Sequence, residues 1–155
     1  MREVTVDIRF TSPCLGATRV PDGPVRFDRA GEDVTFPLSA WRRALELGAD
    51  TVGVPRDRVD GIRIDPIIRR KPDIYKRYYA EGQFTAHEAY LTDTTISVTA
   101  LIPHTVSDAL FMKIMTAIGK WWGISPYGWE KYGYGRFVVV KHTKTSGQDM
   151  ACGDN

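Results

Sequence analysis

The stretch from Gly119 to Val140 constrains the fold most, because it joins a helix to a strand through a segment dense in glycine and aromatic rings. Five glycines fall within 17 residues, and six tryptophans and tyrosines lie among them. We expect the helix to end at Gly123, since glycine is favoured just after a helix, and a β-branched strand to begin at Phe137. The segment between them is therefore a loop too short to bury all of its rings.

Two interpretations of this loop stay open from the residues alone. In the first, exposed rings such as Tyr127 and Trp129 stack on the bases of a single-stranded nucleic acid, while Lys131 and Arg136 attract its phosphates. In the second, the tyrosines brace a structural turn. We expect Trp121 to belong to the hydrophobic core, because it continues the apolar stripe of the preceding helix.

Five segments have the sequence pattern of β-strands. Apolar and polar residues alternate, or β-branched residues dominate, over residues 4–10, 59–68, 84–91, 95–102 and 137–141. The runs 84–91 and 95–102 are joined by Thr92-Asp-Thr, which predicts a hairpin. The basic segment 69–82 contains Pro72 and Gly82, and we expect it to be a long connection.

Two segments have helical periodicity, residues 38–49 and a stretch from about Thr105 to Trp121, which Thr105 and Asp108 would open as a capping box. A small hairpin is predicted before the first helix, with Val25-Arg-Phe and Val34-Thr-Phe on either side of Asp28-Arg-Ala-Gly31. The order is taken as strand, helix, strand, strand, helix, strand, which holds one strand fewer than the five strand-like segments. It predicts an α+β fold of the ferredoxin-like βαββαβ type, an antiparallel sheet with both helices on one face.

The length of 155 residues favours a single domain, which we assign to residues 1–142, with the polar residues 143–155 as a disordered tail. The N-terminus lacks the apolar core of a signal peptide, and no run of ~18 apolar residues exists to span a membrane. We therefore expect a cytoplasmic protein without a membrane partner. Cys14 and Cys152 are interpreted as reduced thiols.

Positive charge is concentrated in two segments, although the net charge of the chain is only +2. Within 69–79, five cations face only Asp73, and within 120–144 five cations face only Glu130, so each segment carries +4. Both are interleaved with aromatic rings. This segregation is typical of a surface that binds phosphates, although a solvated loop explains either segment by itself.

The residues carry no strong catalytic or cofactor signature. His87, His104 and His142 lack the spacing of metal ligands, and neither a phosphate-binding P-loop nor a dinucleotide fingerprint is present. We therefore predict no cofactor, no metal and no catalytic residue. A metal-independent ribonuclease needs only one general base and a cation, so His104 or His142 stays open for that role.

The segments Gly123-Ile-Ser-Pro-Tyr-Gly128 and Gly133-Tyr-Gly-Arg-Phe137 resemble the glycine-rich loop between the last helix and last strand in the RAMP superfamily of CRISPR-associated proteins. The opening strand and the turn through Phe10-Thr-Ser-Pro-Cys-Leu-Gly16 are also similar to such domains. A weaker likeness is to small proteins of phages and mobile elements. The RAMP resemblance implies that Gly133, Gly135 and Arg136 approach an RNA backbone.

The lead hypothesis is a non-catalytic protein that binds RNA or single-stranded nucleic acid, alone, as a homo-oligomer or in a larger ribonucleoprotein. Its predicted binding residues are Arg69, Arg70, Lys71, Lys76, Arg77, Tyr127, Trp129, Lys131, Tyr132, Gly133, Tyr134, Gly135 and Arg136. One alternative is a protein–protein interaction module, such as a phage-encoded inhibitor or an assembly subunit, that uses the same aromatic surface. A second alternative is a metal-independent endoribonuclease.

Overall fold

The computed structural model describes residues 1–16, 18–19, 24–127 and 132–144. Its central feature is a four-stranded antiparallel sheet with the order β12-β1-β11-β7. These strands are β1 (Arg2–Phe10), β7 (Arg63–Ile64), β11 (Thr95–Ile102) and β12 (Phe137–Lys144). Val4, Val6, Ile8 and Phe10 of β1 are buried on one face, as the alternation of apolar and polar residues predicts.

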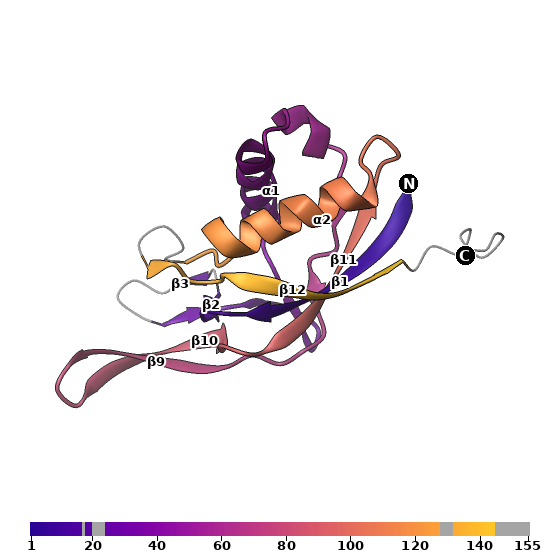
Figure 1. Ribbon diagram of the computed structural model, residues 1–155. Coiled ribbons are helices and arrows are strands. Elements are labelled where there is room, and N and C mark those ends of the chain that lie inside the picture. The colour runs from indigo at the N-terminus through magenta and orange to yellow at the C-terminus, as the bar shows by residue number, and fades with distance from the viewer. Residues whose placement is uncertain (17, 20–23, 128–131, 145–155) are drawn as a thin grey trace.

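Both helices cover the same face of this sheet (Figure 1). They are α1 (Leu38–Val52) and α2 (Asp108–Ala117), and the π-helical turn η2 (Ile118–Trp122) continues α2. The helices pack closely at Gly48, where an added Cβ would lie 2.9 Å from Cγ2 of Ile114. Ser107, rather than Thr105, caps α2, because its hydroxyl accepts a hydrogen bond from the backbone N–H of Leu110.

A second sheet, with the order β2-β10-β9, carries a long hairpin away from the body of the molecule (Figure 1). It consists of β2 (Cys14–Leu15), β9 (Asp73–Ala80) and β10 (Gln83–Tyr90). Gly82 turns the chain at the tip with a φ of 71°, in the region that favours glycine. The segment predicted as a connection over 69–82 is therefore largely a strand, and that prediction was wrong.

The remaining elements are short. They are β3 (Thr18–Arg19), β4 (Val25–Arg26), β5 (Asp28–Ala30), β6 (Asp33–Thr35), β8 (Ile67–Ile68) and the 3-10 helix η1 (Arg56–Val59). Strand β3 pairs with β4, and β5, β6 and β8 form a three-stranded sheet. A small hairpin is thus present before α1 as β5 and β6, but its first strand begins at Asp28, because the predicted strand at Val25 is β4 and pairs with β3. The predicted strand 59–68 is instead divided between β7 and β8, which belong to different sheets on either side of Pro66.

The predicted hairpin between residues 84–91 and 95–102 is wrong, although both strands exist. Strand β10 pairs with β9 and β2, whereas β11 pairs with β1 and β7. The chain turns between the two sheets at Asp93, whose φ of 72° is left-handed and whose N–H donates to the carbonyl of Phe10 at 2.7 Å. Tertiary pairing with β1 therefore overrides the local hairpin signal.

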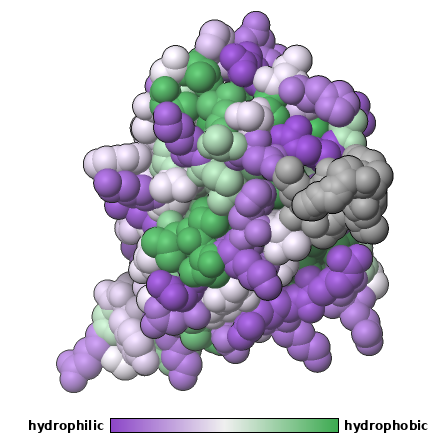
Figure 2. Space-filling model, turned by 45° about the vertical axis from the view of Figure 1, so that its right-hand side comes forward, coloured by the Kyte–Doolittle hydropathy of each residue, from purple (hydrophilic) through white to green (hydrophobic). Residues whose placement is uncertain are grey.

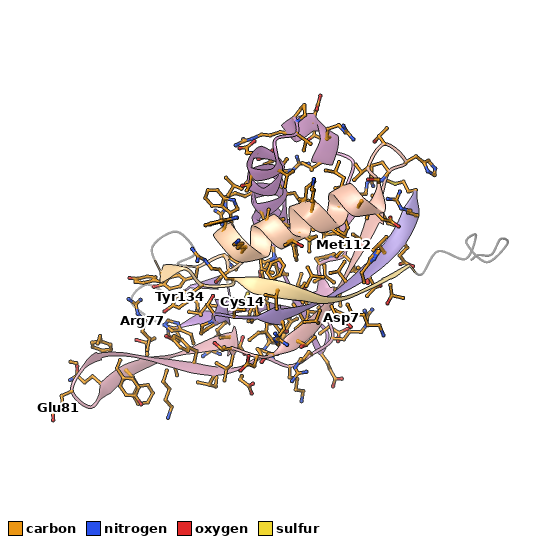
Figure 3. All side chains as sticks on the ribbon, in the orientation of Figure 1. Asp7, Cys14, Arg77, Glu81, Met112 and Tyr134 are labelled. Carbon is orange, nitrogen blue, oxygen red and sulfur yellow. The ribbon has the colours of Figure 1, made fainter. Side chains whose placement is uncertain are left out.

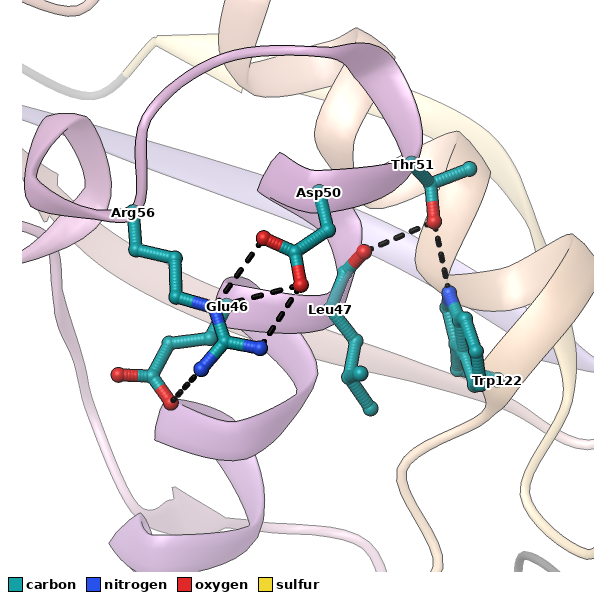
Figure 4. Close-up of polar contacts among 6 residues, drawn as sticks. All are labelled: Glu46, Leu47, Asp50, Thr51, Arg56 and Trp122. Carbon is teal, nitrogen blue, oxygen red and sulfur yellow. Dashed lines mark hydrogen bonds and ion pairs between the residues drawn. The ribbon is translucent and has the colours of Figure 1, made fainter.

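Trp121 is 54% exposed, so its assignment to the core was wrong. In η2 the N–H of Gly123 donates to the carbonyl of Ile118, five residues earlier, and this wider turn rotates Trp121 off the buried stripe. Trp122 is anchored instead, because its indole N–H donates to the Thr51 hydroxyl at 2.9 Å. Figure 4 shows this contact beside the hydrogen bond from Thr51 to the carbonyl of Leu47.

The α+β class, with mostly antiparallel sheets and two helices, is confirmed, and the order of the main sheet is consistent with a ferredoxin-like arrangement. Strand β12 continues to Lys144, two residues beyond the predicted end of the domain. The predicted tail from residue 145 onward lies outside the described residues. Apolar side chains also gather in patches on the surface shown in Figure 2, between hydrophilic ones. No helix in the described part of the chain is long and apolar enough to cross a membrane.

Candidate nucleic-acid interface

The β9–β10 hairpin and the segment after η2 are far apart in the sequence but meet at a cluster of tyrosine rings. The Tyr75 and Tyr134 rings pack edge to face with 5.8 Å between their centroids, and the Tyr132 ring lies 5.4 Å from that of Tyr134. The guanidinium carbon of Arg77 lies 4.0 Å from the centroid of the Tyr132 ring, a cation–π distance. Figure 3 shows Arg77 beside Tyr134. The fold thus joins residues from both predicted binding segments.

Alternation along β9 explains this contact. Tyr75 and Arg77 point toward the tyrosine cluster, because residues two apart share one face of a strand. Lys76 and Tyr78 project from the opposite face, where Phe84 of β10 lies across from Tyr78. The Lys76 ammonium is 4.9 Å from the centroid of the Phe84 ring, and the Tyr78 ring is 5.4 Å from it. Both faces of the hairpin therefore carry a cation against an aromatic ring.

Three exposed rings on the hairpin were not among the predicted binding residues. Tyr78 is 65% and Tyr79 is 70% exposed, and Phe84 is also exposed. Large rings left open to solvent beside cations are suited to base stacking. The available signal was the three tyrosines that flank Lys76 and Arg77 between residues 75 and 79, but Pro72 and Gly82 led to the prediction of a connection.

The glycines after η2 let the chain pack against itself. Gly135 has a φ of 80°, and an added Cβ would collide with the backbone nitrogen of Ser125. Its N–H donates to the carbonyl of Pro13 at 2.8 Å, and its carbonyl accepts from the N–H of Ile124 at 3.1 Å. Ser12 adds a further bond, because its hydroxyl donates to the carbonyl of Gly133 at 2.7 Å. These bonds fix Tyr132 and Tyr134 against the hairpin.

The described residues around the loop after η2 differ in their exposure to solvent. Tyr134 and Gly135 are buried, and burial raises the pKa of the Tyr134 phenol. Tyr132 is exposed, and Gly133 and Tyr127 are half-buried. Tyr134 therefore supports the rings around it, and Tyr132 offers the accessible ring.

Arg69, Arg70 and Lys71 are exposed just before β9, at the opposite end of that strand from the hairpin tip. Arg70 donates to the carbonyl of Thr95 at 3.4 Å. Arg69 and Arg70 line a shallow groove over the open face of the main sheet, together with Thr95, Ser97 and Thr99. Asp65 lines the same groove, and the three cations outnumber it at this end of β9.

Arg136 is exposed beside Gly133, and its backbone N–H donates to the Ser12 hydroxyl at 3.0 Å. Its guanidinium carbon would lie 3.9 Å from a Cβ added at Gly133, so the side chain stays close to that glycine. Trp129 and Lys131, which were also predicted to bind nucleic acid, lie outside the described residues.

Two neighbouring residues of β10 hold the body of the protein to the hairpin. The Nδ1 atom of His87 accepts a hydrogen bond from the backbone N–H of Val25 at 2.9 Å. Glu88 accepts from the N–H of Phe27 at 3.0 Å and forms an ion pair with Arg29 at 2.6 Å. Burial raises the pKa of Glu88. The hydrogen bonds from Arg29 and Phe27 together outweigh burial, so the net shift of this pKa is downward. Each residue therefore has a structural role.

Lowering the pH below about 6.5, the ordinary pKa of histidine, is expected to destabilise the fold through His87. Burial lowers the pKa of His87, and the charge of Arg77 acts in the same direction. The unfolded chain therefore binds a proton first, and stability present above pH ~6.5 is lost as the pH falls toward the folded pKa. Urea titrations at pH 7.5 and 5.5 measure this loss.

The variant His87→Asn is the matched control, because the asparagine carbonyl can accept the bond from Val25 but cannot gain a proton. We expect its stability to change less between the two pH values than that of the wild type. An equal loss in both proteins would show that His87 does not carry the effect.

The described residues outline no metal centre, because no group of three or more His, Cys, Asp or Glu side chains among them could hold an ion. Cys14 is buried, and burial raises the pKa of its thiol far above the ordinary value. A protonated, buried thiol is a poor nucleophile. The arrangement is instead suited to holding an anionic, ring-bearing polymer at the hairpin.

Comparison with known proteins gives a structural likeness. No protein-family model matches the chain, and no curated protein sequence matches it. Seventy-two chains of solved structures match. One of them comes from the cryo-EM structure of the type III-B Cmr-beta complex bound to cognate target RNA, with a TM-score of 0.59 and 13% sequence identity. The match covers 94% of this chain and 61% of the other, so the likeness concerns the fold and part of a longer protein.

Proposed function

We propose that this chain binds RNA, or single-stranded nucleic acid more generally, without cleaving it. The binding surface is formed by Tyr75, Lys76, Arg77, Tyr78, Tyr79, Phe84 and Tyr132, called here the hairpin–loop surface. The observation that carries the proposal is the contact of Arg77 with the Tyr132 ring, which joins the two basic and aromatic segments on one face of the hairpin. Lys76, Tyr78 and Phe84 lie on the other face, so the proposed surface extends around the hairpin. A cation held against a ring can bind a phosphate while the neighbouring rings stack on bases.

The residues have separate roles in this proposal. Lys76 and Arg77 bind phosphates, and Tyr78, Tyr79 and Tyr132 stack on bases. Gly133 and Arg136 admit the backbone at the edge of the surface. Trp129 and Lys131, outside the described residues, are proposed to contribute to binding as well. Arg69, Arg70 and Lys71 extend the phosphate path at the start of β9. Tyr127, Tyr134 and Gly135 support the rings from below.

The likeness to a chain of the Cmr-beta complex supports the proposal at the level of the fold. We propose that residues 1–144 are a single RAMP-like, ferredoxin-like unit that works with RNA as part of a ribonucleoprotein, of cellular or phage origin. The antiparallel sheet with both helices on one face agrees with this assignment.

Fluorescence anisotropy with a labelled single-stranded RNA of twenty nucleotides tests this function. We expect saturable binding that weakens as salt rises from 50 to 200 mM, because released counterions drive phosphate binding. A duplex RNA of the same sequence is the matched control and is expected to bind more weakly, since its bases are not open to stacking. Unchanged anisotropy with both RNA and single-stranded DNA at low salt would refute the proposal.

A protein–protein interaction module is a second candidate, and the exposed Ile74 favours it. Ile74 lies on the same face of β9 as Tyr78, and it contributes aliphatic surface that base stacking does not need. Native mass spectrometry separates the two functions. A discrete oligomer that purifies without nucleic acid supports this candidate, and co-purified RNA supports the first.

A further inference from the structure

The β12 edge of the main sheet carries a second surface, which shares Arg136 with the proposed function but none of the residues of the hairpin–loop surface. Strand β12 is an edge strand, because among the described strands it pairs only with β1. An edge strand presents every second N–H and C=O group outward, ready to pair with another chain. Val138 is 40% and Val140 is 45% exposed along this edge. The edge therefore offers both a hydrogen-bonding ladder and apolar contacts.

Two grooves join this edge to the outer face of α2. One is lined by Lys120, Arg136, Phe137, Val138 and Val139, among others, and the second by Thr51, Val52, Met112, Lys113, Lys120 and Trp121, among others. Lys120 and Thr116 line both grooves, so the two grooves are adjacent. The Lys120 ammonium lies 5.0 Å from the centroid of the exposed Trp121 ring.

Every charged residue that lines these grooves is a cation, namely Lys113, Lys120 or Arg136. Two carboxylates in the second half of α1, those of Glu46 and Asp50, are already paired. Asp50 accepts from Arg56 at 2.8 Å, and Glu46 lies 3.8 Å from the same guanidinium, as Figure 4 shows. The hydrogen bond from Arg56 lowers the pKa of Asp50, so its charge persists within that pair. The rim of the grooves therefore keeps a positive charge.

We propose that this β12–α2 surface docks an extended, acidic segment of a partner protein, which adds a strand to the edge of β12. Its backbone pairs with β12, its apolar side chains contact Val138, Val140 and Trp121, and its carboxylates face Lys113 and Lys120. The aliphatic lining favours a polypeptide over a nucleic acid, because valine offers no stacking face. The proposal does not depend on RNA binding at the hairpin.

Labelled dodecapeptides and fluorescence anisotropy test this docking with the full chain. One peptide repeats Glu-Val-Thr-Val, a second replaces glutamate with lysine, and a third replaces valine with serine. We expect only the first to bind, because it alone joins negative charge to apolar side chains at the period of a strand. Failure of the first peptide to bind, or equal binding of all three, would overturn the proposal.

The double variant Lys113→Glu/Lys120→Glu removes the charge complementarity without touching the core, because both side chains are exposed. We expect it to weaken binding of the first peptide about tenfold. The matched control Arg42→Glu/Arg43→Glu carries the same charge change on exposed positions of α1 and is expected to leave peptide binding within twofold. An equal loss of peptide affinity in both double variants would show that the peptide does not contact Lys113 and Lys120 in particular, and would overturn the proposal.

Hydrogen exchange identifies the strand addition itself. The outward amides of β12 are expected to exchange more slowly when the first peptide is bound, and unchanged exchange there would refute the pairing. A concentration-dependent dimer abolished by Lys113→Glu/Lys120→Glu would assign the surface to a second copy of the chain instead. A loss of RNA affinity in that variant, with peptide binding retained, would assign it to nucleic acid. Either result would overturn the proposal. The dimer would not bear on the hairpin–loop surface, whereas the loss of RNA affinity would place part of the RNA-binding surface on α2.

Discussion

Replacing Gly135 with alanine is expected to lower the free energy of unfolding by about 3 kcal/mol, the largest effect of any substitution considered for the loop. A left-handed φ of 80° costs a non-glycine residue about 1–2 kcal/mol. The new Cβ would also collide with the backbone of Ser125, and forcing atoms into a packed interior costs about 1–3 kcal/mol more. Urea denaturation followed by tryptophan fluorescence measures the change.

Gly133→Ala is the matched control, two residues away in the same loop. Its φ of 68° is also left-handed, but the nearest atom to an added Cβ is Nε of Arg136 at 3.8 Å, an ordinary contact. We therefore expect a loss of only about 1 kcal/mol. If Gly135→Ala retained wild-type stability but lost RNA binding, Gly135 would serve the ligand and not the packing of the chain.

The double variant Lys76→Gln/Arg77→Gln is expected to lower the affinity for single-stranded RNA about 20-fold at 0.1 M salt. Two lost phosphate contacts remove about 1.4 from the slope of log affinity against log salt concentration. Arg77 also loses its contact with the Tyr132 ring, which lies 4.0 Å away. Anisotropy titrations at several salt concentrations give both the affinity and the slope.

The control for this variant is Arg42→Gln/Arg43→Gln, which removes the same charge from the exposed side of α1, away from the hairpin (Figure 1). We expect its RNA affinity to stay within twofold of the wild type. If both double variants lost affinity equally, the protein would bind RNA through its overall charge. The hairpin–loop surface would then have no special role.

Much of the fold follows from local sequence patterns. The alternation in residues 4–10 identified β1, and the apolar stripe from Trp41 to Gly48 identified α1, because burial on one face leaves a direct periodic trace. The pairing partners of β10 and β11 produce no such periodic pattern in the sequence. Two strands with the same alternation and a short turn between them can pair with each other as a hairpin or belong to two different sheets. The pairing of β11 with β1 selects the second arrangement.

The candidate site was predicted in part. The sequence indicated that residues 69–79 and the loop after η2 were basic and aromatic, but only the fold shows that Arg77 meets Tyr132. Arg69, Arg70 and Lys71 belong to the same run of sequence but lie at the other end of β9. Trp121 was misplaced because an α-helical period was assumed through a π-helical turn. A single wider turn changes which face a residue occupies, and the residue types do not reveal it.

Photocrosslinking of RNA that contains 4-thiouridine, followed by mass spectrometry of the crosslinked peptides, tests the central claim most directly. We predict that crosslinks concentrate at Tyr78, Tyr79, Phe84 and Tyr132 of the hairpin–loop surface, and that they decline in Lys76→Gln/Arg77→Gln. Crosslinks located mainly at Trp121 or along α1, with the hairpin free of them, would contradict the account.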